Sequence, residues 1–273
     1  MSDETLISVE KLWSLIGTPN CPRLIDARID EDYNNDPRMI PTAMRRSGFE
    51  AMNWGADYGN VPVIIYCEHG LKLSQGAAAW LRHLGCDAAS LTGGFVAWRQ
   101  AGLPLVPEVK MPTQDANGAG VWVTRSRPKI DRIACPWLIR RFVDPDAVFL
   151  FVEPAEVLNV ADRFGVTAFD VEDVHWSHRG EKCTFDTMVE EFGLTTEPLL
   201  RLAEIIRGAD TGRPDLAPES AGLLAVSLGL SQLFGDDLAQ LEKGIDLYDA
   251  FYAWVRDAAD ETHNWPARAG DVA

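Results

Sequence analysis

The sequence predicts an α/β fold for its first part, a parallel sheet with helices on both faces. A mixed second domain follows that is mostly α-helical with a few strands. Before residue 107, short apolar runs alternate with helical patterns, which is typical of parallel strands joined by helices. From Phe185 onward the pattern is almost entirely helical. With 273 residues, the chain is long enough for two ordinary domains.

A segment rich in proline, glycine and polar residues divides the two parts. We therefore expect a first domain over 1–106, a linker over 107–120 and a second domain over 121–273. In the first domain we expect a helix over 8–16, strands over 23–28, 63–66 and 86–91, a helix beginning after Ser74 and a helix ending at Gly102. In the second we expect strands over 121–124, 146–152 and 167–171, and helices starting at Pro136 and over 154–164, 187–192, 197–208, 220–234 and 236–257.

The stretch Val63-Ile-Ile-Tyr66-Cys67 places a cysteine directly after a buried strand. A glycine-containing loop follows, and Ser74 is a good N-cap for the next helix. A cysteine between a strand end and a helix N-terminus lies among free backbone N–H groups, which favour the thiolate and attract anions. The alternative is a buried and inert thiol. The order of strand, cysteine, loop, serine and helix favours the reactive interpretation.

Several motifs of the first domain occur in a recognisable order. They are Leu24-Ile-Asp26-Ala-Arg28, Ile40-Pro41-Thr-Ala43, Cys67-x-x-Gly70 with Lys72, and Gly93-Gly94-Phe-x-x-Trp98 ending at Gly102-Leu-Pro104. Over roughly residues 5–106, this domain resembles the rhodanese family of sulfurtransferases. The resemblance implies that Cys67 accepts sulfane sulfur as a persulfide. It also implies that Asp26 and Arg28 have an architectural role.

The same resemblance implies roles for the residues that follow Cys67. Lys72 would hold the anionic donor, and His69 would either assist proton transfer or be a solvated bystander. The backbone amides that would bind the anion belong to Glu68, Gly70, Leu71 and Leu73. We expect the Glu68 side chain to point away from the cysteine, since an inward carboxylate would oppose the thiolate.

The chain departs from the rhodanese pattern at a few positions. Lys72 stands where the family commonly has arginine, so a compact ammonium charge replaces a planar guanidinium group. Leu73 delays Ser74 by one position, which predicts a longer loop and a wider anion cradle. Thr42 stands where the family often has glycine. We expect the partner to be a small sulfur donor or oxyanion, with thiosulfate as the first candidate and chromate as the alternative.

The one concentrated basic stretch of the chain opens the second domain, over 125–141. Pro136 suits the first position of a helix, which would place Cys135 at its N-cap. A thiolate would be favoured there, and nearby arginines would add to the effect. The alternative is that Cys135 packs in the core.

A second group of polar residues lies over 175–186. His178, Cys183 and Asp186 could together ligate Zn or Fe, although their spacing matches no standard zinc motif. The alternative is a solvated loop that leads into a helix capped by Thr184 or Asp186.

The second domain resembles the C-terminal domain of the chromate-resistance family of ChrB type, over roughly 121–258. The resemblance rests on Lys129-Ile-Asp-Arg-Ile-Ala-Cys135-Pro-Trp-Leu-Ile-Arg140-x-Phe142, His178-x-Gly180-Glu-x-Cys183-x-Phe-Asp186 and Arg207-Gly-Ala-Asp210-Thr. It implies a relation to chromate resistance and a metal or oxyanion site among the polar residues of these motifs. Those residues are Asp131, Arg132, Cys135, His178, Cys183, Asp186 and Asp210. The DNA-binding role of some family members depends on a basic region that this chain lacks, and it is not carried over.

Composition limits the classes of partner. A formal charge of −16 argues against nonspecific binding of nucleic acid. No apolar run approaches the roughly 20 residues of a membrane-spanning helix, and no secretory signal is visible. The five scattered cysteines suggest reduced thiols. We therefore expect a cytoplasmic protein that binds neither nucleic acid nor membrane, and that could form a homo-oligomer.

Three functions remain open from the sequence alone. The first is a sulfurtransferase-type enzyme whose persulfide forms on Cys67, coupled to a second domain that supplies a thiol, a metal centre or an oxyanion site. The second is a sensor or resistance accessory protein that binds an oxyanion or metal without turnover. The third is an interaction scaffold.

Overall fold

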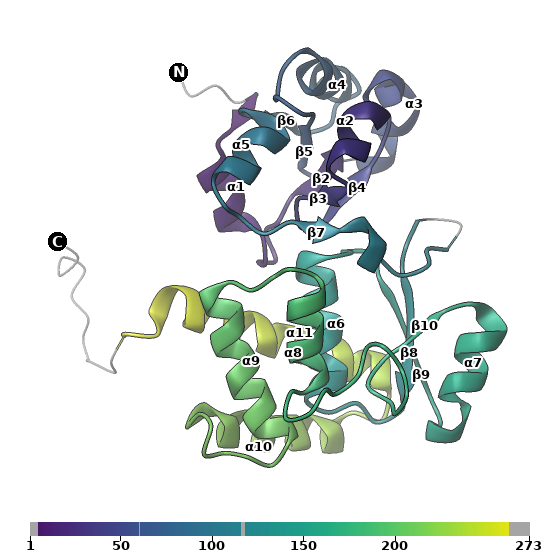
Figure 1. Cartoon of the computed structure of the whole chain (residues 1–273), viewed down its shortest axis with the longest axis vertical. Helices are drawn as coiled ribbons and strands as arrows, with labels where there is room; N and C mark the ends of the chain where they lie inside the picture. Colours follow the sequence, from purple (N-terminus) through teal and green to yellow (C-terminus); the bar gives the residue numbers. More distant parts are fainter. Residues whose placement is uncertain (1–4, 60, 116–117, 262–273) are drawn as a thin grey trace.

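The computed structural model describes residues 5–59, 61–115 and 118–261, so the outermost residues of both predicted domains lie outside the described residues. The first part, drawn in purple to blue, stacks on the second part, drawn in teal to yellow (Figure 1). The elements of the first part are β1 (Leu6–Ile7), α1 (Val9–Leu15), β2 (Arg23–Asp26), α2 (Asp30–Asn35), β3 (Arg38–Met39), β4 (Ala43–Arg45), α3 (Ala51–Trp54), β5 (Val63–Tyr66), α4 (Lys72–His83), β6 (Ala88–Leu91), α5 (Gly94–Gln100) and β7 (Val106–Pro107).

The first part has the predicted parallel sheet, with the strand order β1-β6-β5-β2-β4. Successive side chains of β5 alternate between two apolar clusters because strand residues point to opposite faces. Ile64 and Tyr66 join the cluster that contains α1 and α5, whereas Val63 and Ile65 join the cluster that contains α3 and α4. Both faces are therefore covered, and β5 is buried along its whole length.

The segment predicted as a linker contains regular structure where it is described. Pro107 pairs with Arg38 as part of the antiparallel ribbon of β3 and β7. A 3₁₀ turn follows over Glu108–Lys110, and Gln114 forms a β-bridge with Gly120. Residues 116–117 of this segment lie outside the described residues.

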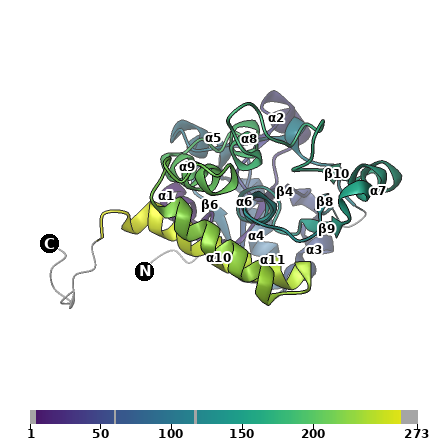
Figure 2. The same ribbon diagram turned by 90° about the horizontal axis from the view of Figure 1, so that it is seen from below.

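The second part combines a small parallel sheet, in the order β10-β8-β9, with a bundle of helices. Helix α7 covers the sheet, and α10 lies at the end of the molecule farthest from the first part (Figures 1 and 2). Its elements are β8 (Val121–Arg125), α6 (Asp131–Phe142), β9 (Val148–Val152), α7 (Val157–Phe164), β10 (Thr167–Ala168), α8 (Thr184–Glu191), α9 (Glu197–Asp210), α10 (Glu219–Leu233) and α11 (Asp237–Ala253), which continues into a π-helical turn (Trp254–Ala258). The four C-terminal helices confirm the helical pattern predicted from Phe185 onward.

Helix α6 begins earlier than predicted. It starts at Asp131, so Pro136 lies inside the helix and is buried with Cys135. Its first turn is held by bonds from the Ile133 and Ala134 N–H groups to the Ile130 carbonyl. The expectation that Pro136 starts the helix and Cys135 caps it is therefore wrong.

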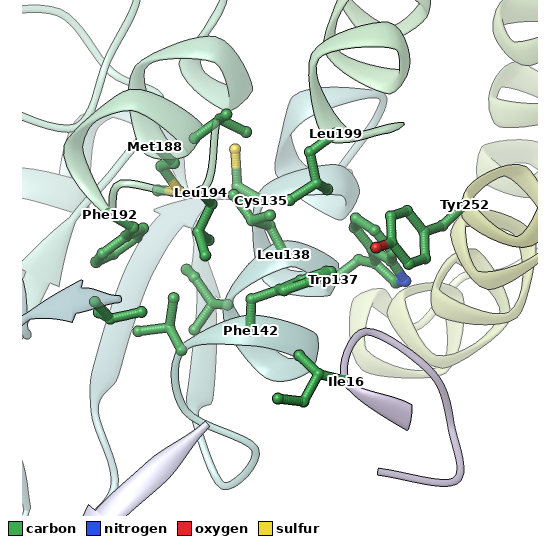
Figure 3. Close-up of a cluster of buried hydrophobic side chains, with 14 of the residues drawn as sticks. Ile16, Cys135, Trp137, Leu138, Phe142, Met188, Phe192, Leu194, Leu199 and Tyr252 are labelled. Carbon is green, nitrogen blue, oxygen red and sulfur yellow. The ribbon is translucent and has the colours of Figure 1, made fainter. Parts of the chain in front are cut away.

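One apolar core runs through both parts. Ile16, at the end of α1, lies beside Phe142 of α6, and Trp137 and Tyr252 pack next to them (Figure 3). The Thr42 N–H donates to the Phe142 carbonyl at 3.0 Å, which joins the two parts through their backbones. Arg23 forms a bidentate ion pair with Asp146, with N–O distances of 2.8 and 2.6 Å. Among the described residues, no helix is long and apolar enough to cross a membrane.

Candidate functional site

Cys67 lies at the carboxyl end of β5 and at the base of a cleft of about 600 Å³. Its side chain is only 7% exposed, and its Sγ donates to the Ser74 Oγ at 3.3 Å. The cleft is lined by both apolar and polar residues of the loop, of α4 and of the facing segments. They are Ile29, Asp32, Gly48, Phe49, Glu68, His69, Leu71, Lys72, Leu73, Gly76, Ala77 and Trp80.

Two glycines fix the loop after Cys67. Both have positive φ, which L side chains rarely adopt. A Cβ on Gly70 would lie 2.3 Å from the Leu91 carbonyl oxygen, and a Cβ on Gly94 would lie 2.2 Å from the Cys67 carbonyl oxygen. The loop therefore packs directly on the Gly93-Gly94 turn, with the Phe95 N–H donating to the Cys67 carbonyl at 3.0 Å.

Helix α4 begins at Lys72, with Leu71 as its N-cap, so the prediction that Ser74 caps it is wrong. The Gln75 N–H bonds to the Leu71 carbonyl and closes the first turn. Ser74 is thus inside the helix, where its buried hydroxyl meets the Cys67 thiol and Ser90. Leu73, which was expected to lengthen the loop, lies in helix α4. An extra loop residue therefore does not widen the anion cradle. The first N–H groups of a helix have no partner within the helix, and the contact between Ser74 and Cys67 places the cysteine beside this first turn.

The remaining predicted residues of this site are placed as follows. His69, Leu71 and Lys72 are exposed and line the cleft, whereas Gly70 is buried behind it. Glu68 is half-buried, and its Oε2 is buried without a hydrogen-bond partner among the described residues. Burial raises the pKa of Glu68, while the charge of Arg28 opposes that rise. One oxygen of the Glu68 carboxylate is therefore withdrawn from solvent, while its orientation away from the cysteine stays a prediction.

Asp26 and Arg28 form a buried framework beneath this loop, in agreement with an architectural role. Both side chains are fully buried, and the Arg28 Nη2 lies 2.5 Å from the Asp26 Oδ2. Arg28 also donates to the carbonyls of Asp36 and Arg38 and lies over the Phe95 ring at 3.7 Å. The guanidinium thus ties the strand end to the segment that packs against Cys67.

A second polar cluster forms in the other half of the molecule, at the carboxyl ends of β8 and β10. The His178 Nε2 lies 3.5 Å from Asp131 Oδ2, 3.5 Å from Asp170 Oδ1 and 3.3 Å from Asp210 Oδ2. Asp131 opens α6, Asp170 follows β10 and Asp210 ends α9. Ligand atoms of Asp131, Asp170 and His178 all lie within 4.8 Å of one another.

Thr184 holds two of these carboxylates in place. Its N–H donates to Asp131 Oδ2 at 2.6 Å, and its hydroxyl donates to Asp170 Oδ1 at 2.9 Å. The other oxygen of Asp170 lies 3.0 Å from Arg125 Nη2 and 3.3 Å from Arg132 Nε. The predicted residue Arg132 is thus a partner of Asp170.

The charges and hydrogen bonds of this cluster shift the pKa values of its side chains. Hydrogen bonds to Asp170 and Asp210 raise the pKa of His178 to about 10. Burial raises the pKa of Asp131, and the nearby Asp210 and Asp170 add to that effect. For Asp170, burial is outweighed by hydrogen bonds from His178 and Thr184, so its pKa is lowered.

The structure does not bring Cys183 and Asp186 to His178 as a ligand set. The Cys183 N–H donates to Asp186 Oδ2 at 3.0 Å, and Arg207 donates to Asp186 Oδ1 at 2.7 Å, so Asp186 caps α8. Cys135 and Cys183 are fully buried, and burial raises the pKa of both thiols. Neither cysteine presents an accessible thiolate, so of the two alternatives for Cys135 the structure favours packing in the core.

Sequence reasoning missed Asp170, Thr184 and Arg125. A signal was available for two of them, because Arg125 ends β8 and Asp170 comes two residues after the end of β10. Carboxyl ends of parallel strands meet at one sheet edge, where binding sites gather. Thr184 gave no such signal, since its role depends on the position of α6.

Comparison with known proteins identifies the first part as a rhodanese-like domain. The model of the family "Rhodanese-like domain" matches residues 8–101. A second model, "ChrB, C-terminal domain", matches residues 122–255. The chain therefore belongs to the rhodanese-like family and carries a ChrB C-terminal domain after the rhodanese-like one. Both resemblances inferred from the sequence are confirmed.

Individual relatives match one part each. The chain is 32% identical over 102 residues to the thiosulfate sulfurtransferase GlpE of Actinobacillus succinogenes, covering 37% of this chain and 89% of that protein. It is 35% identical over 132 residues to protein ChrB of Cupriavidus metallidurans, covering 48% of this chain but only 39% of that protein. A solved rhodanese-related protein of Thermoplasma volcanium aligns with a TM-score of 0.34 and 21% identity, over 38% of this chain and 99% of that one.

Proposed function

We propose that the protein is a sulfurtransferase in which Cys67 carries sulfur as a persulfide. The observation that supports this most is the position of Cys67, which follows β5, faces the first turn of α4 and opens into the cleft. A related protein that matches the first part over most of its own length is named a thiosulfate sulfurtransferase. Thiosulfate is therefore the donor that we propose first.

The reaction has two balanced steps. The Cys67 thiolate attacks the outer sulfur of thiosulfate, the S–S bond breaks, and sulfite leaves with the bonding electron pair. An acceptor nucleophile, a thiolate or cyanide, then attacks the outer sulfur of the persulfide and releases the Cys67 thiolate. The Ser74 hydroxyl would donate to the thiolate, since it already contacts the thiol at 3.3 Å. Lys72 and the free N–H groups of the first turn of α4 would stabilise the anionic donor.

Incubation with thiosulfate followed by intact-mass measurement tests this proposal. We expect the mass of one added sulfur on the wild-type chain and none on Cys67→Ser. Cys86→Ser is the matched control, because Cys86 is 6% exposed and donates to the Gly55 carbonyl away from the cleft. Equal sulfur addition to wild type and Cys67→Ser, or none to either, would refute it.

An oxyanion-binding second part is the other candidate, with chromate as the ligand implied by the relation to chromate resistance. A cleft of about 520 Å³ supports it, since Arg179, Lys182, Arg207 and Arg213 line it. Each of these cations already contacts a carboxylate, which weakens the case. Calorimetric titration with chromate and sulfate tests it, and equal heats from wild type and Arg213→Ala would count against it.

A further inference from the structure

We propose that Asp131, Asp170 and His178 form a binding site for a divalent cation of the Mn²⁺ or Fe²⁺ class, with Asp210 as an additional ligand. The site is independent of Cys67. Its ligands differ from the set of His178, Cys183 and Asp186 that the sequence suggested.

The geometry is that of a site where side chains converge on one point. Ligand atoms of Asp131, Asp170 and His178 lie within 4.8 Å of one another, and Asp210 Oδ2 lies 3.3 Å from His178 Nε2. Oxygen and nitrogen ligands bind such ions at about 2.0–2.2 Å, so ligand atoms around one ion lie within several ångströms of each other. Ligand atoms at these separations are therefore close enough to share one ion.

A second observation points to a missing ligand. Asp131 is fully buried, and its Oδ1 has no hydrogen-bond partner among the described residues, while its Oδ2 accepts from the Thr184 N–H. An unpaired carboxylate oxygen in the interior is costly unless a cation or donor satisfies it. The Oδ2 of the same carboxylate lies 3.5 Å from His178 Nε2, so a cation held by both oxygens of Asp131 would supply that partner.

The surroundings orient the ligands as second shells of metal sites do. Thr184 bonds Asp131 through its N–H and Asp170 through its hydroxyl. Arg125 and Arg132 occupy only the Oδ2 of Asp170, so its Oδ1 stays on the side of His178. Both carboxylates are thus held with one oxygen toward the centre of the cluster.

The donor set selects the class of ion. Carboxylates with one imidazole suit Mn²⁺ and Fe²⁺, whereas thiolates would favour zinc or copper. Cys135 and Cys183 are buried in the neighbouring core and do not belong to the group of ligand atoms. The His178 side chain is 41% exposed, so an ion would be reached from solvent and would keep water among its ligands.

Manganese binding to the full-length chain tests the site. After removal of metals with EDTA and dialysis, Mn²⁺ would be titrated while the electron paramagnetic resonance signal of the free ion is followed. We expect one bound Mn²⁺ per chain, and a loss of affinity of at least roughly tenfold in His178→Ala. His178 is partly exposed, so this variant should fold, and Asp131→Asn provides an independent second variant.

Matched controls separate this site from its alternatives. Asp215→Asn alters an exposed carboxylate that pairs with Arg213, and it should bind Mn²⁺ as the wild type does. Cys183→Ala should also bind normally, whereas the sequence-based ligand set predicts a loss. Cys67→Ser should retain binding even if the sulfurtransferase proposal fails. Absence of saturable Mn²⁺ binding, or equal affinity in the wild type, His178→Ala and Asp131→Asn, would overturn the inference.

Discussion

The Cys67 loop takes its parts from consecutive residues over 67–74, whereas the cluster of Asp131, Asp170, His178 and Asp210 gathers side chains from separate segments of the second part. The first site uses backbone: free N–H groups at a helix start and a loop fixed by glycines. The second uses side chains, which Thr184 and two arginines orient. A site of backbone geometry tolerates changes of side chain, while a site of converging side chains depends on each of them.

The two sites also differ in how buried charge is neutralised. Beneath the Cys67 loop, Asp26 has a complete partner in Arg28. In the cluster, Asp131 has a buried oxygen without any partner among the described residues. Charge removal should therefore have opposite effects on stability in the two places.

The largest effect is expected at Arg28. Arg28→Ala would leave Asp26 charged and buried, and the carbonyls of Asp36 and Arg38 would lose a donor. We expect the free energy of unfolding to fall by about 3–5 kcal/mol. Urea denaturation followed by circular dichroism measures it. Arg213→Ala is the control, since its pair with Asp215 is exposed and its loss should change stability far less. Equal losses in both variants would contradict the prediction.

A second effect is expected at the junction of the two parts, and it depends on pH. Burial raises the pKa of Cys21 from 9.0 to about 11, although Thr42, Arg141 and Arg23 oppose the rise. The folded state therefore prefers the neutral thiol, while the unfolded state ionises first. The stabilising contribution of this thiol is complete below pH 9 and is lost as the pH rises toward 11.

The difference of two pKa units corresponds to about 2–3 kcal/mol at most. We expect the wild type to lose more stability between pH 8 and pH 11 than Cys21→Ala does, with the stability of each protein at pH 8 as its own reference. Chemical denaturation at both pH values gives the comparison. Equal losses of stability in the wild type and Cys21→Ala would show that ionisation of Cys21 does not make the stability of the protein depend on pH.

The two sites could be predicted from the sequence to different degrees. The position of Cys67 follows from neighbouring residues, so the strand and the loop were predicted, and only the start of the helix was displaced. Lys72 and Leu73 are good helix formers, and they continue the helix back to Leu71 without the serine cap. In the second part, Asp170 meets Asp131 only after β10 pairs with β8, and no local pattern encodes that contact.

Two outcomes in the second part have local causes. Pro136 is typical of the first position of a helix, yet α6 starts at Asp131, after Ile130 takes the unusual φ of 35°. For Asp186 the sequence left two alternatives, a metal ligand and a helix cap, and the structure has the cap, because an acidic residue at the third helix position completes a capping box. Composition and spacing cannot separate a cap from a ligand when the rest of the site is remote in sequence.

A smaller and opposite effect is expected from Asp131→Asn. Without added cation, the amide removes a carboxylate whose charge is opposed by burial, by Asp210 and by Asp170, and these effects exceed the attraction of His178. The amide can still accept from the Thr184 N–H. We expect the free energy of unfolding at neutral pH in EDTA to rise by about 1 kcal/mol. With Mn²⁺ present the order should reverse, because only the wild type gains stability from the ion. Thermal unfolding under both conditions measures this, and a lower stability of the variant in EDTA would contradict it.

The smallest effect concerns Thr42, which joins the two parts through its N–H. Its φ is +69°, a conformation that costs a β-branched residue of order 1 kcal/mol or more and costs glycine little. Thr42→Gly keeps the bond to the Phe142 carbonyl and relieves the strain, but it adds freedom to the unfolded chain. We expect a net gain below about 1 kcal/mol in thermal unfolding. Thr92→Gly, at a turn position without positive φ, should instead lower stability. A loss in Thr42→Gly as large as that in Thr92→Gly would mean that the Thr42 side chain, with its contact to Cys21 at 3.8 Å, holds the junction more than its backbone does.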